Sequence, residues 1–444
     1  MSAPRTVPAD REIGVSLRFS GSLDALSPTD RRALFERTPN GNPAVAAETA
    51  RIVADVRARG DDALRDMARR FDSVDLDALE VPRASLVKAL DGLPLPLRRA
   101  MERAARNIET VHRAFAPTPM EVSPEPGVLV GRRPDPLQRV GVYAPGGRAS
   151  YPSSVLMGAV PARVAGVAEI TLCSPPDRTG SPPSAILAAA ALAHVDRVFA
   201  VGGAGAIAAM ALGTESIPRV DRIVGPGNAY VSAAKLQLIG FVAIDSPAGP
   251  SELLIIADDS ADPRDIAIEM VAQAEHDPNA CVVALVVSQV RTDDVIRALS
   301  STLPSVGRHG IVAAALGANG GVLSLHSLDE AIEFANAYAP EHLLLAIRSP
   351  DDVLPLLRNS GTVFLGNGSS VAFGDYMTGA NHVLPTGGSA RAYSGLSPLD
   401  FVRWTTYQRV DERAAARFAE DVGQFADAES LSGHAAAARR WCQP

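Results

Sequence analysis

Two adjacent titratable residues, Glu341 and His342, stand directly before an apolar run in the segment PEHLLLAI. A carboxylate and an imidazole can exchange protons near neutral pH, so this pair could act in general acid–base catalysis. The apolar run predicts a buried strand, and the pair would lie at its beginning. On these residues alone, a helix end or a loop rim is the alternative interpretation.

Two further polar pairs occur near predicted helix ends. Gln273 and His276 are three residues apart in VAQAEHDP, so their side chains would share one face of a helix. An amide oxygen and an imidazole nitrogen on one face can bind a metal ion, although this spacing is less diagnostic than HExxH. Glu429 and His434 precede the last predicted helix. Capping and solvation of helix ends are the alternative interpretation of both pairs.

A glycine-rich segment, FGDYMTGANHVLPTGG at 373–388, contains Asp375 and His382 and has no apolar periodicity. Loops with this much glycine and few solubilising charges often line functional sites. Asp375 and His382 are therefore further candidates for binding or catalysis.

Three glycine-rich turns could approach a dinucleotide. In VGGAGAIAAM, Gly203, Gly205 and Ala208 fit a GxGxxA pattern between a predicted strand and a predicted helix. Asp221 follows at a suitable distance for a ribose contact. The two other turns are APGG at 144–147 and GPGNAY at 225–230. Alanine- and glycine-rich turns match this pattern often, so an ordinary strand–helix turn is the alternative, although such loops can converge on one ligand.

The elements that must position these residues alternate between strand and helix. Helical periodicity covers residues 44–116, and strand–turn–helix units then recur from RVGVY to TVFLG, with helix again after about Leu396. This alternation predicts an α/β fold of two doubly wound, Rossmann-like domains with smaller helical N- and C-terminal extensions. The expected units are an N-terminal extension (1–43), a Rossmann-like dinucleotide-binding domain (139–248), a second α/β domain with the catalytic candidates (44–138 and 249–395) and a C-terminal helical domain (396–444).

Composition narrows the class of protein. The 444 residues are 47% hydrophobic and 21% charged, so the chain can form large cores. The net charge of −8 and the lack of a dense Lys/Arg cluster argue against nucleic-acid binding. Cys173, Cys281 and Cys442 show no CxxC spacing, which excludes a cysteine zinc site and suggests a reducing compartment. Without an apolar leader or a long apolar run, we expect a cytoplasmic protein with no membrane segment.

Six segments occur in a consistent order and spacing: RVGVYAPGGRASYPSSVLM, VGPGNAYVSAAK, SPAGPSELL, QAEHDP, NAYAPEHL and GDYMTGANHVLPTGG. Together they resemble the histidinol dehydrogenase family, and the resemblance extends from about residue 44 to residue 440. It implies an NAD-dependent, zinc-containing homodimer. It also implies oxidation of L-histidinol through L-histidinal to L-histidine, the last two steps of histidine biosynthesis.

The resemblance assigns roles to individual residues. The catalytic pair falls on Glu341 and His342. The zinc ligands fall on Gln273, His276, Asp375 and His434, the last contributed across the dimer by the C-terminal domain, so that the active site is shared between subunits. Substrate contacts fall on Ser251, Gln273, His276, His342, Asp375, Glu429 and His434. NAD contacts fall on Tyr143, Asn228 and Gly205.

Two positions depart from the family pattern. Gly205 stands where the family usually has a glutamine that touches the dinucleotide, and Val371 stands where many members carry a glutamate. A paralogous zinc- and NAD-dependent dehydrogenase for another small polar alcohol is therefore one alternative. A two-lobed α/β binding protein without catalysis is another, but it predicts a secretion signal and no acid–base pair.

Adjacent Glu341 and His342 suit two successive oxidations. Hydride loss from an alcohol requires a base for the hydroxyl proton, and an imidazole of ordinary pKa, about 6.5, can accept it at pH 7. The second oxidation starts from an aldehyde, and an ionised carboxylate could draw a proton from the water that adds to it. Neighbouring residues of a strand point to opposite faces, so both must lie at its frayed start, which the preceding Pro340 favours. The resemblance implies that zinc holds the imidazole and amino nitrogens of the substrate.

Overall fold

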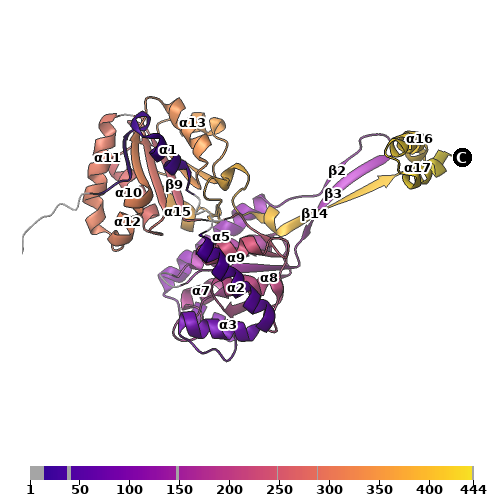
Figure 1. Ribbon diagram of the computed structural model, residues 1–444, viewed down its shortest axis with the longest axis horizontal. Helices are drawn as coiled ribbons and strands as arrows, with labels where there is room; N and C mark the ends of the chain where they lie inside the picture. Colours follow the sequence, from indigo (N-terminus) through magenta and orange to yellow (C-terminus); the bar gives the residue numbers. More distant parts are fainter. Residues whose placement is uncertain (1–14, 38–41, 147–149, 248, 288, 443–444) are drawn as a thin grey trace, which may run out of the picture.

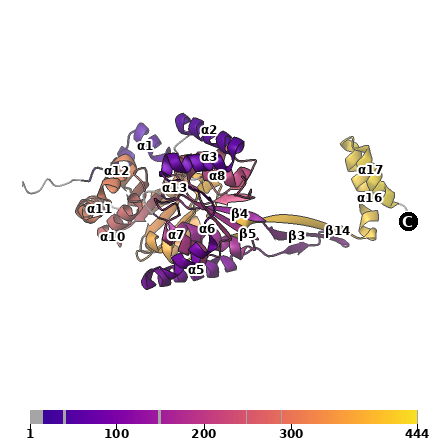
Figure 2. The ribbon, with the colours of Figure 1, turned by 90° about the horizontal axis from the view of Figure 1, so that it is seen from below.

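The computed structural model describes residues 15–37, 42–146, 150–247, 249–287 and 289–442. Gly147 of the first glycine-rich turn, Ala248 of SPAGPSELL and residues 1–14 of the extension lie outside these ranges. Two α/β lobes lie side by side, and a long arm extends from one of them to a pair of helices at the far end (Figures 1 and 2). Within the described residues, no helix is long and apolar enough to span a membrane.

The first lobe is built on a six-stranded sheet in which every neighbouring pair is parallel. Its strands, in spatial order, are β1 (Phe19–Ser22), β11 (Gly320–Ser324), β10 (Cys281–Val286), β9 (Glu252–Ala257), β12 (His342–Ala346) and β13 (Thr362–Leu365). The central strands are apolar and buried on both faces, as expected for a sheet covered by crossover helices. We refer to it as sheet A.

Alternate residues of sheet A enter two separate cores. Leu253 and Ile255 face α10 (Pro263–Ala274), α11 (Gln289–Thr302) and α12 (His309–Asn319). Leu254 and Ile256 face α1 (Pro28–Phe35) and α13 (Leu328–Tyr338). Two short helices, α14 (Pro350–Val353) and α15 (Val371–Tyr376), follow β12 and β13. The N-terminal extension is therefore more than helical, because β1 adds an edge strand to this sheet.

The second lobe is built on a five-stranded parallel sheet, sheet B. Its strands, in spatial order, are β6 (Arg197–Ala200), β5 (Glu169–Ser174), β4 (Arg139–Tyr143), β7 (Arg222–Val224) and β8 (Ala243–Ile244). The crossover helices are α6 (Pro152–Val164), α7 (Ser184–Leu192), α8 (Gly203–Leu212) and α9 (Ala229–Gln237). Two doubly wound α/β lobes are thus present, as the alternation of strand and helix predicts.

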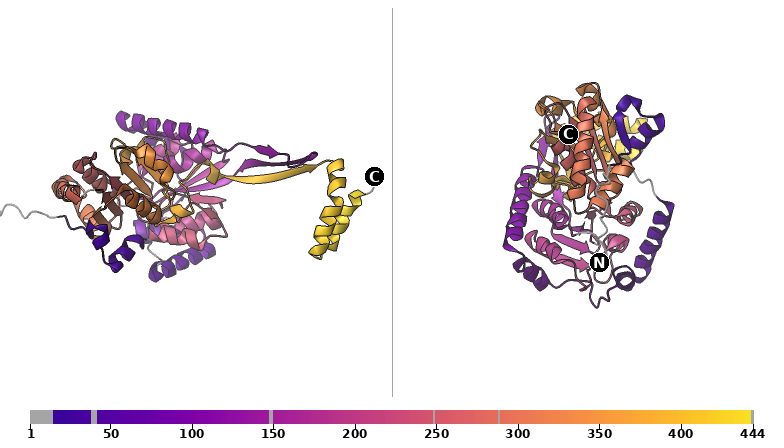
Figure 3. Two further views of the ribbon diagram at one scale, coloured as in Figure 1. Left: turned by 90° about the horizontal axis from the view of Figure 1, so that it is seen from above. Right: turned by 90° about the vertical axis from the view of Figure 1, so that its left-hand side faces the viewer.

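The helices between residues 43 and 114 depart from the expected domain assignment. We expected 44–138 to join 249–395, but α2 (Pro43–Arg59) and α3 (Asp61–Met67) pack with α8 and α9 on one side of sheet B. On the other side, α4 (Arg83–Asp91) and α5 (Leu95–Ala114) pack with α6 and α7. The alanine-rich surfaces of the crossover helices admit this second layer, which sequence order alone does not reveal (Figure 3).

The arm is an antiparallel sheet of β2 (Met120–Val122), β3 (Val128–Pro136) and β14 (Val402–Val410). It ends in α16 (Glu412–Ala428) and α17 (Ser432–Arg439), which project away from both lobes (Figures 1 and 3). We expected helix throughout the chain after Leu396, and residues 402–410 are instead a strand. The segment VRWTTYQRV is rich in β-branched and aromatic residues, which favour a strand.

Candidate active site

Glu341 and His342 lie at the beginning of β12, as predicted from the apolar run that follows them. Both side chains are buried, and His342 Nδ1 lies 3.5 Å from Glu341 Oε2. The two side chains therefore lie together despite being neighbours in sequence, because Glu341 precedes the regular part of the strand. The first residue of β9, Glu252, holds them both with its backbone N–H and carbonyl groups. Its N–H donates to Glu341 Oε2 at 2.7 Å, and its carbonyl oxygen lies 2.8 Å from His342 Nδ1.

The contact with Glu252 fixes the tautomer of His342. A carbonyl oxygen can only accept a hydrogen bond, so Nδ1 must carry the proton in this contact. In a neutral imidazole, the lone pair then lies on Nε2. That atom is buried and has no hydrogen-bond partner among the described residues, and it lies 4.0 Å from Asp375 Oδ1. Nε2 is thus the basic atom that His342 offers to a ligand.

Burial and the nearby carboxylates have opposite effects on the pKa of His342. Burial lowers the pKa of His342, but the carboxylates of Glu341 and Asp375 outweigh burial and raise it to about 9. The ordinary value of about 6.5 assumed from the sequence is therefore wrong for this environment. With this pKa the imidazole carries a proton at pH 7, unless a cation bound nearby offsets the carboxylates.

The candidate metal ligands come from two neighbouring helices. Glu269 of α10 accepts a hydrogen bond from the N–H of Val371 at 3.1 Å, which joins α10 to the start of α15. Gln273 lies one turn beyond Glu269 and is buried, and half-buried His276 follows the helix. Asp375 lies in α15. The closeness of these two elements also appears at Tyr376, whose pKa is raised by burial and then by Asp375 and Glu275.

His434 does not join these ligands within one chain. It lies exposed in the first turn of α17, at the end of the arm, and exposed Glu429 caps the preceding helix α16 (Figure 1). No group of three His, Cys, Asp or Glu suitable for a metal occurs among the described residues of a single chain. The donors that one chain brings together, an imidazole, a carboxylate and an amide oxygen, nonetheless suit zinc chemically.

Two candidate NAD contacts, Tyr143 and Asn228, lie at the carboxyl ends of strands of sheet B. Tyr143 ends β4, and its hydroxyl accepts a hydrogen bond from the N–H of Gly203 at 3.0 Å. Asn228 is exposed and caps α9 by accepting from the N–H groups of Tyr230 and Val231. The turns of Gly203 and Asn228 therefore lie at the same edge of the sheet as Tyr143, where open α/β folds bind ligands.

Two positions of the glycine-rich pattern behave differently from expectation. Gly205 is buried in the first turn of α8, and a Cβ there would lie 2.8 Å from Met67 Sδ of α3. Position 205 thus faces α3, and only its backbone could reach a ligand. Asp221 is not a ribose ligand candidate, because it precedes β7 and accepts from the N–H of Arg139 at the opposite edge of the sheet.

Val371 and Ser251 have distinct surroundings. Val371 is buried and packs in the core of sheet A, so this departure from the family pattern is not in a polar pocket. Ser251 precedes β9, is half-buried and accepts from the N–H of Cys281 through its carbonyl oxygen at 3.0 Å. It therefore lies next to Glu252, at the same edge of sheet A as the acid–base pair.

The site also contains His382, which has no role among the sequence-based assignments. Its Nδ1 lies 3.0 Å from the carbonyl oxygen of Asp375 and 3.8 Å from Asp375 Oδ1. Burial lowers the pKa of His382, and Asp375 opposes this effect. The glycine-rich segment signalled both residues, but spacing alone did not distinguish a site histidine from a loop histidine.

Two parallel α/β lobes, one with glycine-rich turns at its strand ends and one with a buried acid–base pair, define a dinucleotide-type oxidoreductase. The profile of the histidinol dehydrogenase family matches residues 36–441. The chain belongs to the histidinol dehydrogenase family, whose members are NAD-dependent oxidoreductases.

Individual relatives agree with this assignment. The histidinol dehydrogenase of Natronomonas pharaonis is 47% identical over 412 residues, 92% of this chain and 96% of the relative. That of Methanosarcina mazei is 44% identical over 414 residues, 93% of this chain and 95% of the relative. The crystal structure of the Elizabethkingia anophelis histidinol dehydrogenase superimposes with a TM-score of 0.91 at 35% identity, covering 96% of this chain and 98% of that one.

Proposed function

We propose that this protein oxidises L-histidinol through L-histidinal to L-histidine, with NAD as the hydride acceptor and zinc as a resident metal. The observation that carries the proposal is the buried Glu341–His342 pair, whose Nε2 lies beside Asp375 and has no hydrogen-bond partner in the described part of the chain. It occurs in a chain whose histidinol dehydrogenase relatives cover almost its whole length.

His342 is the base of the first oxidation. The neutral form of His342 would be favoured by a cation bound near Glu341 and Asp375, which offsets the carboxylates that raise its pKa. In that form Nε2 accepts the hydroxyl proton as hydride leaves for NAD, while the Nδ1–H bond to the Glu252 carbonyl holds the ring in orientation. Glu341 acts in the second oxidation, where its carboxylate takes a proton from the water that adds to the aldehyde. Its Oε2 is held by the Glu252 N–H, so the side chain is oriented before substrate arrives.

Gln273, His276 and Asp375 are the proposed zinc ligands of one subunit, and His434 is the proposed ligand from a partner. When bound, the zinc would hold the imidazole and amino nitrogens of the substrate and so orient its hydroxyl. The arm supports a shared site, because it carries Glu429 and His434 away from the lobes of their own chain (Figure 2). His434 also lines an apolar surface hollow with Phe418, Val422 and Trp441, and such a surface suits an interface between subunits.

NAD is proposed to lie at the carboxyl edge of sheet B, in contact with Tyr143 and Asn228. The backbone N–H of Gly205 belongs to the first turn of α8, and unpaired N–H groups of a helix start suit a pyrophosphate. The buried position of Val371 removes one of the two features that favoured a paralogous substrate.

Two substitutions test the division of proton transfers. His342→Asn should lower histidinol oxidation about 10²–10⁴-fold, the usual contribution of a general base. Glu341→Gln should spare histidinol oxidation and block that of histidinal. Single-turnover NADH formation with each substrate measures both steps. Equal losses of the two steps in both variants would contradict the assignment.

A complementation experiment tests the shared site. His434→Ala and His276→Ala subunits are each expected to be inactive. Random mixing gives about half heterodimers with one intact site each, so about a quarter of the wild-type activity should return. No recovery in a mixture shown to contain heterodimers would contradict the shared site.

A further inference from the structure

We propose that Arg37 and Glu252 form a buried ion pair that positions the Glu341 carboxylate and the His342 imidazole. Both are positioning residues, because they act through the catalytic pair and not on the substrate. The inference rests on the proposed function, in which Glu341 and His342 handle the two proton transfers.

Glu252 is the residue on which both catalytic side chains depend. Its N–H donates to Glu341 Oε2 and its carbonyl oxygen accepts from His342 Nδ1, at 2.7 and 2.8 Å. These two groups belong to the peptide units on either side of the Glu252 Cα, so a shift of the Glu252 backbone would displace the carboxylate and the imidazole together. The position of that backbone depends on what holds the Glu252 side chain.

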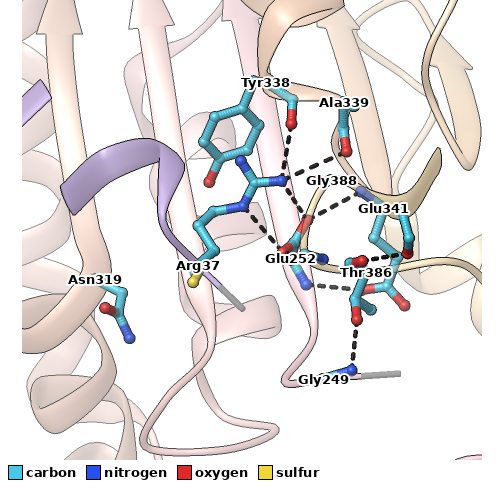
Figure 4. Close-up of polar contacts among 12 residues, drawn as sticks. Arg37, Gly249, Glu252, Asn319, Tyr338, Ala339, Glu341, Thr386 and Gly388 are labelled. Carbon is cyan, nitrogen blue, oxygen red and sulfur yellow. Dashed lines mark hydrogen bonds and ion pairs between the residues drawn. The ribbon is translucent and has the colours of Figure 1, made fainter. Parts of the chain in front are cut away.

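The side chain of Glu252 is buried and held from several sides (Figure 4). Arg37 Nε lies 3.0 Å from Glu252 Oε1 and Arg37 Nη2 lies 3.1 Å from Oε2, which is a bidentate pair. The N–H of Gly387 donates to Oε1 at 2.7 Å, and the N–H of Glu341 donates to Oε2 at 3.4 Å. The carboxylate therefore joins the N-terminal segment, the glycine-rich segment and the start of β12.

Arg37 also holds the turn that leads into the catalytic pair. Its guanidinium lies 3.4 Å from the ring centre of Tyr338, and Nη2 donates to the carbonyl oxygens of Tyr338 and Ala339 at 2.9 and 3.5 Å. Ala339 has a φ of +53°, an unfavourable backbone conformation for a residue other than glycine. These are the last carbonyls of α13, where a cation is stabilising. Arg37 thus joins Glu252 to the backbone just before Glu341.

Stability alone is a poor explanation for this ion pair. The side chains of Arg37 and Glu252 are 3% and 1% exposed, and desolvation of such a buried pair cancels most of its Coulomb gain. Apolar residues of similar volume could stabilise the same core without charges. A planar guanidinium, in contrast, can fix a carboxylate and two carbonyls at once, which apolar packing cannot do. The pair is therefore suited to precise orientation.

Three variants test the proposal: Arg37→Lys, Arg37→Met and Glu252→Gln. We expect Arg37→Met to lower kcat for histidinol and for histidinal about 100-fold, the usual effect of a misplacement of about 1 Å. KM for histidinol and the zinc content should stay within about threefold of wild type, because no proposed ligand is touched. Arg37→Lys keeps the positive charge but lacks the planar guanidinium that binds several oxygens at once. Its kcat should therefore lie between those of Arg37→Met and the wild type. The Arg37→Met/Glu252→Gln double variant should be no slower than the slower single variant.

Arg31→Met is the matched control, because Arg31 also pairs with a carboxylate, Asp24, in the N-terminal segment but lies at the protein surface. It should leave kcat unchanged. Urea unfolding of each variant identifies losses that arise only from unfolding. Folded Arg37→Lys and Glu252→Gln variants with wild-type kcat would overturn the proposal, as would a kcat loss that only tracks the unfolded fraction. A wild-type protein that releases no NADH from histidinol would instead overturn the proposed function.

Discussion

The substitution Lys235→Met should weaken both the fold and NAD binding. The sequence has only two lysines, Lys88 and Lys235, and Lys235 is buried. Its Nζ lies 2.6 Å from Asp245 Oδ1 and donates to the carbonyl oxygen of Gly225 at 2.6 Å. Asp245 Oδ2 accepts from the N–H of Gly225 at 2.7 Å. The pair thus fixes both peptide groups of Gly225, the first residue of the turn that ends at Asn228.

The magnitude follows from the burial of both charges. Removing one partner of such a pair costs about 3–5 kcal/mol, because the other charge stays buried without compensation. Burial raises the pKa of Asp245, and Lys235 lowers it. Without Lys235 the pKa of Asp245 rises further, so the buried carboxyl takes up a proton. A carboxyl with a raised folded-state pKa loses stability as pH rises through that pKa. The deficit of Lys235→Met should therefore be larger at pH 8 than at pH 5.

Urea unfolding at pH 5, 7 and 8, followed by circular dichroism, measures this deficit. Steady-state kinetics should show a higher KM for NAD, because the turn of Asn228 loses its anchor, with a smaller change in KM for histidinol. Lys88→Met is the control, since Lys88 is exposed in α4 and should be neutral. A Lys235→Met deficit below about 1 kcal/mol at pH 7, with an unchanged KM for NAD, would refute the reasoning.

Three further predictions concern other parts of the molecule. His112 is buried, neither ring nitrogen has a partner among the described residues, and burial lowers its pKa to about 4. Its contribution to stability should therefore be complete above about pH 6.5 and be lost as pH falls toward 4, by at most about 3 kcal/mol; His112→Leu should flatten this dependence in urea titrations. Gly225→Ala should prevent NAD binding, because φ is +115° and a Cβ would lie 2.1 Å from the carbonyl oxygen of Tyr143, whereas Gly310→Ala, in open space, should be tolerated in a fluorescence titration. His276→Ala should lower bound zinc well below about one ion per chain by mass spectrometry, and undiminished zinc would exclude His276 as a ligand.

The parallel strands of both sheets could be predicted because their signal is local. The runs LLIIA and CVVALV are apolar throughout, as strands buried on both faces must be, and each is followed by a turn and a helix. The position of Glu341 and His342 followed from the same signal, since a polar pair in front of such a run can only lie where the strand begins. The strand β14 was not predicted, because its apolar residues, Val402, Trp404, Tyr407 and Val410, do not keep the period of two that marks a half-buried strand.

What could not be predicted depends on contacts between distant parts of the chain. Arg37 and Glu252 are 215 residues apart, and neither has a neighbour in sequence that indicates an ion pair. The pKa of His342 depends first on burial and on Glu341, and also on Asp375, which belongs to another element. Likewise, Asp221 had a suitable spacing from the glycine-rich turn, but strand direction brought it to the other edge of sheet B. The spacing of residues in the sequence does not show at which edge of a sheet they lie.

The position of the acid–base pair at the amino-terminal edge of sheet A has a physical explanation. Parallel α/β sheets usually bind ligands at the carboxyl ends of their strands, yet here the pair lies at the amino ends of β9 and β12. The ladder between these strands begins with Leu253 opposite His342, so the peptide groups of Glu252 precede it. They bind the Glu341 carboxylate and the His342 imidazole in place of a neighbouring strand. The backbone at the start of a strand is held as rigidly as the sheet, but the N–H and C=O of Glu252 are not needed for the ladder with β12. They can therefore orient an acid–base pair that would otherwise have to be positioned by a loop.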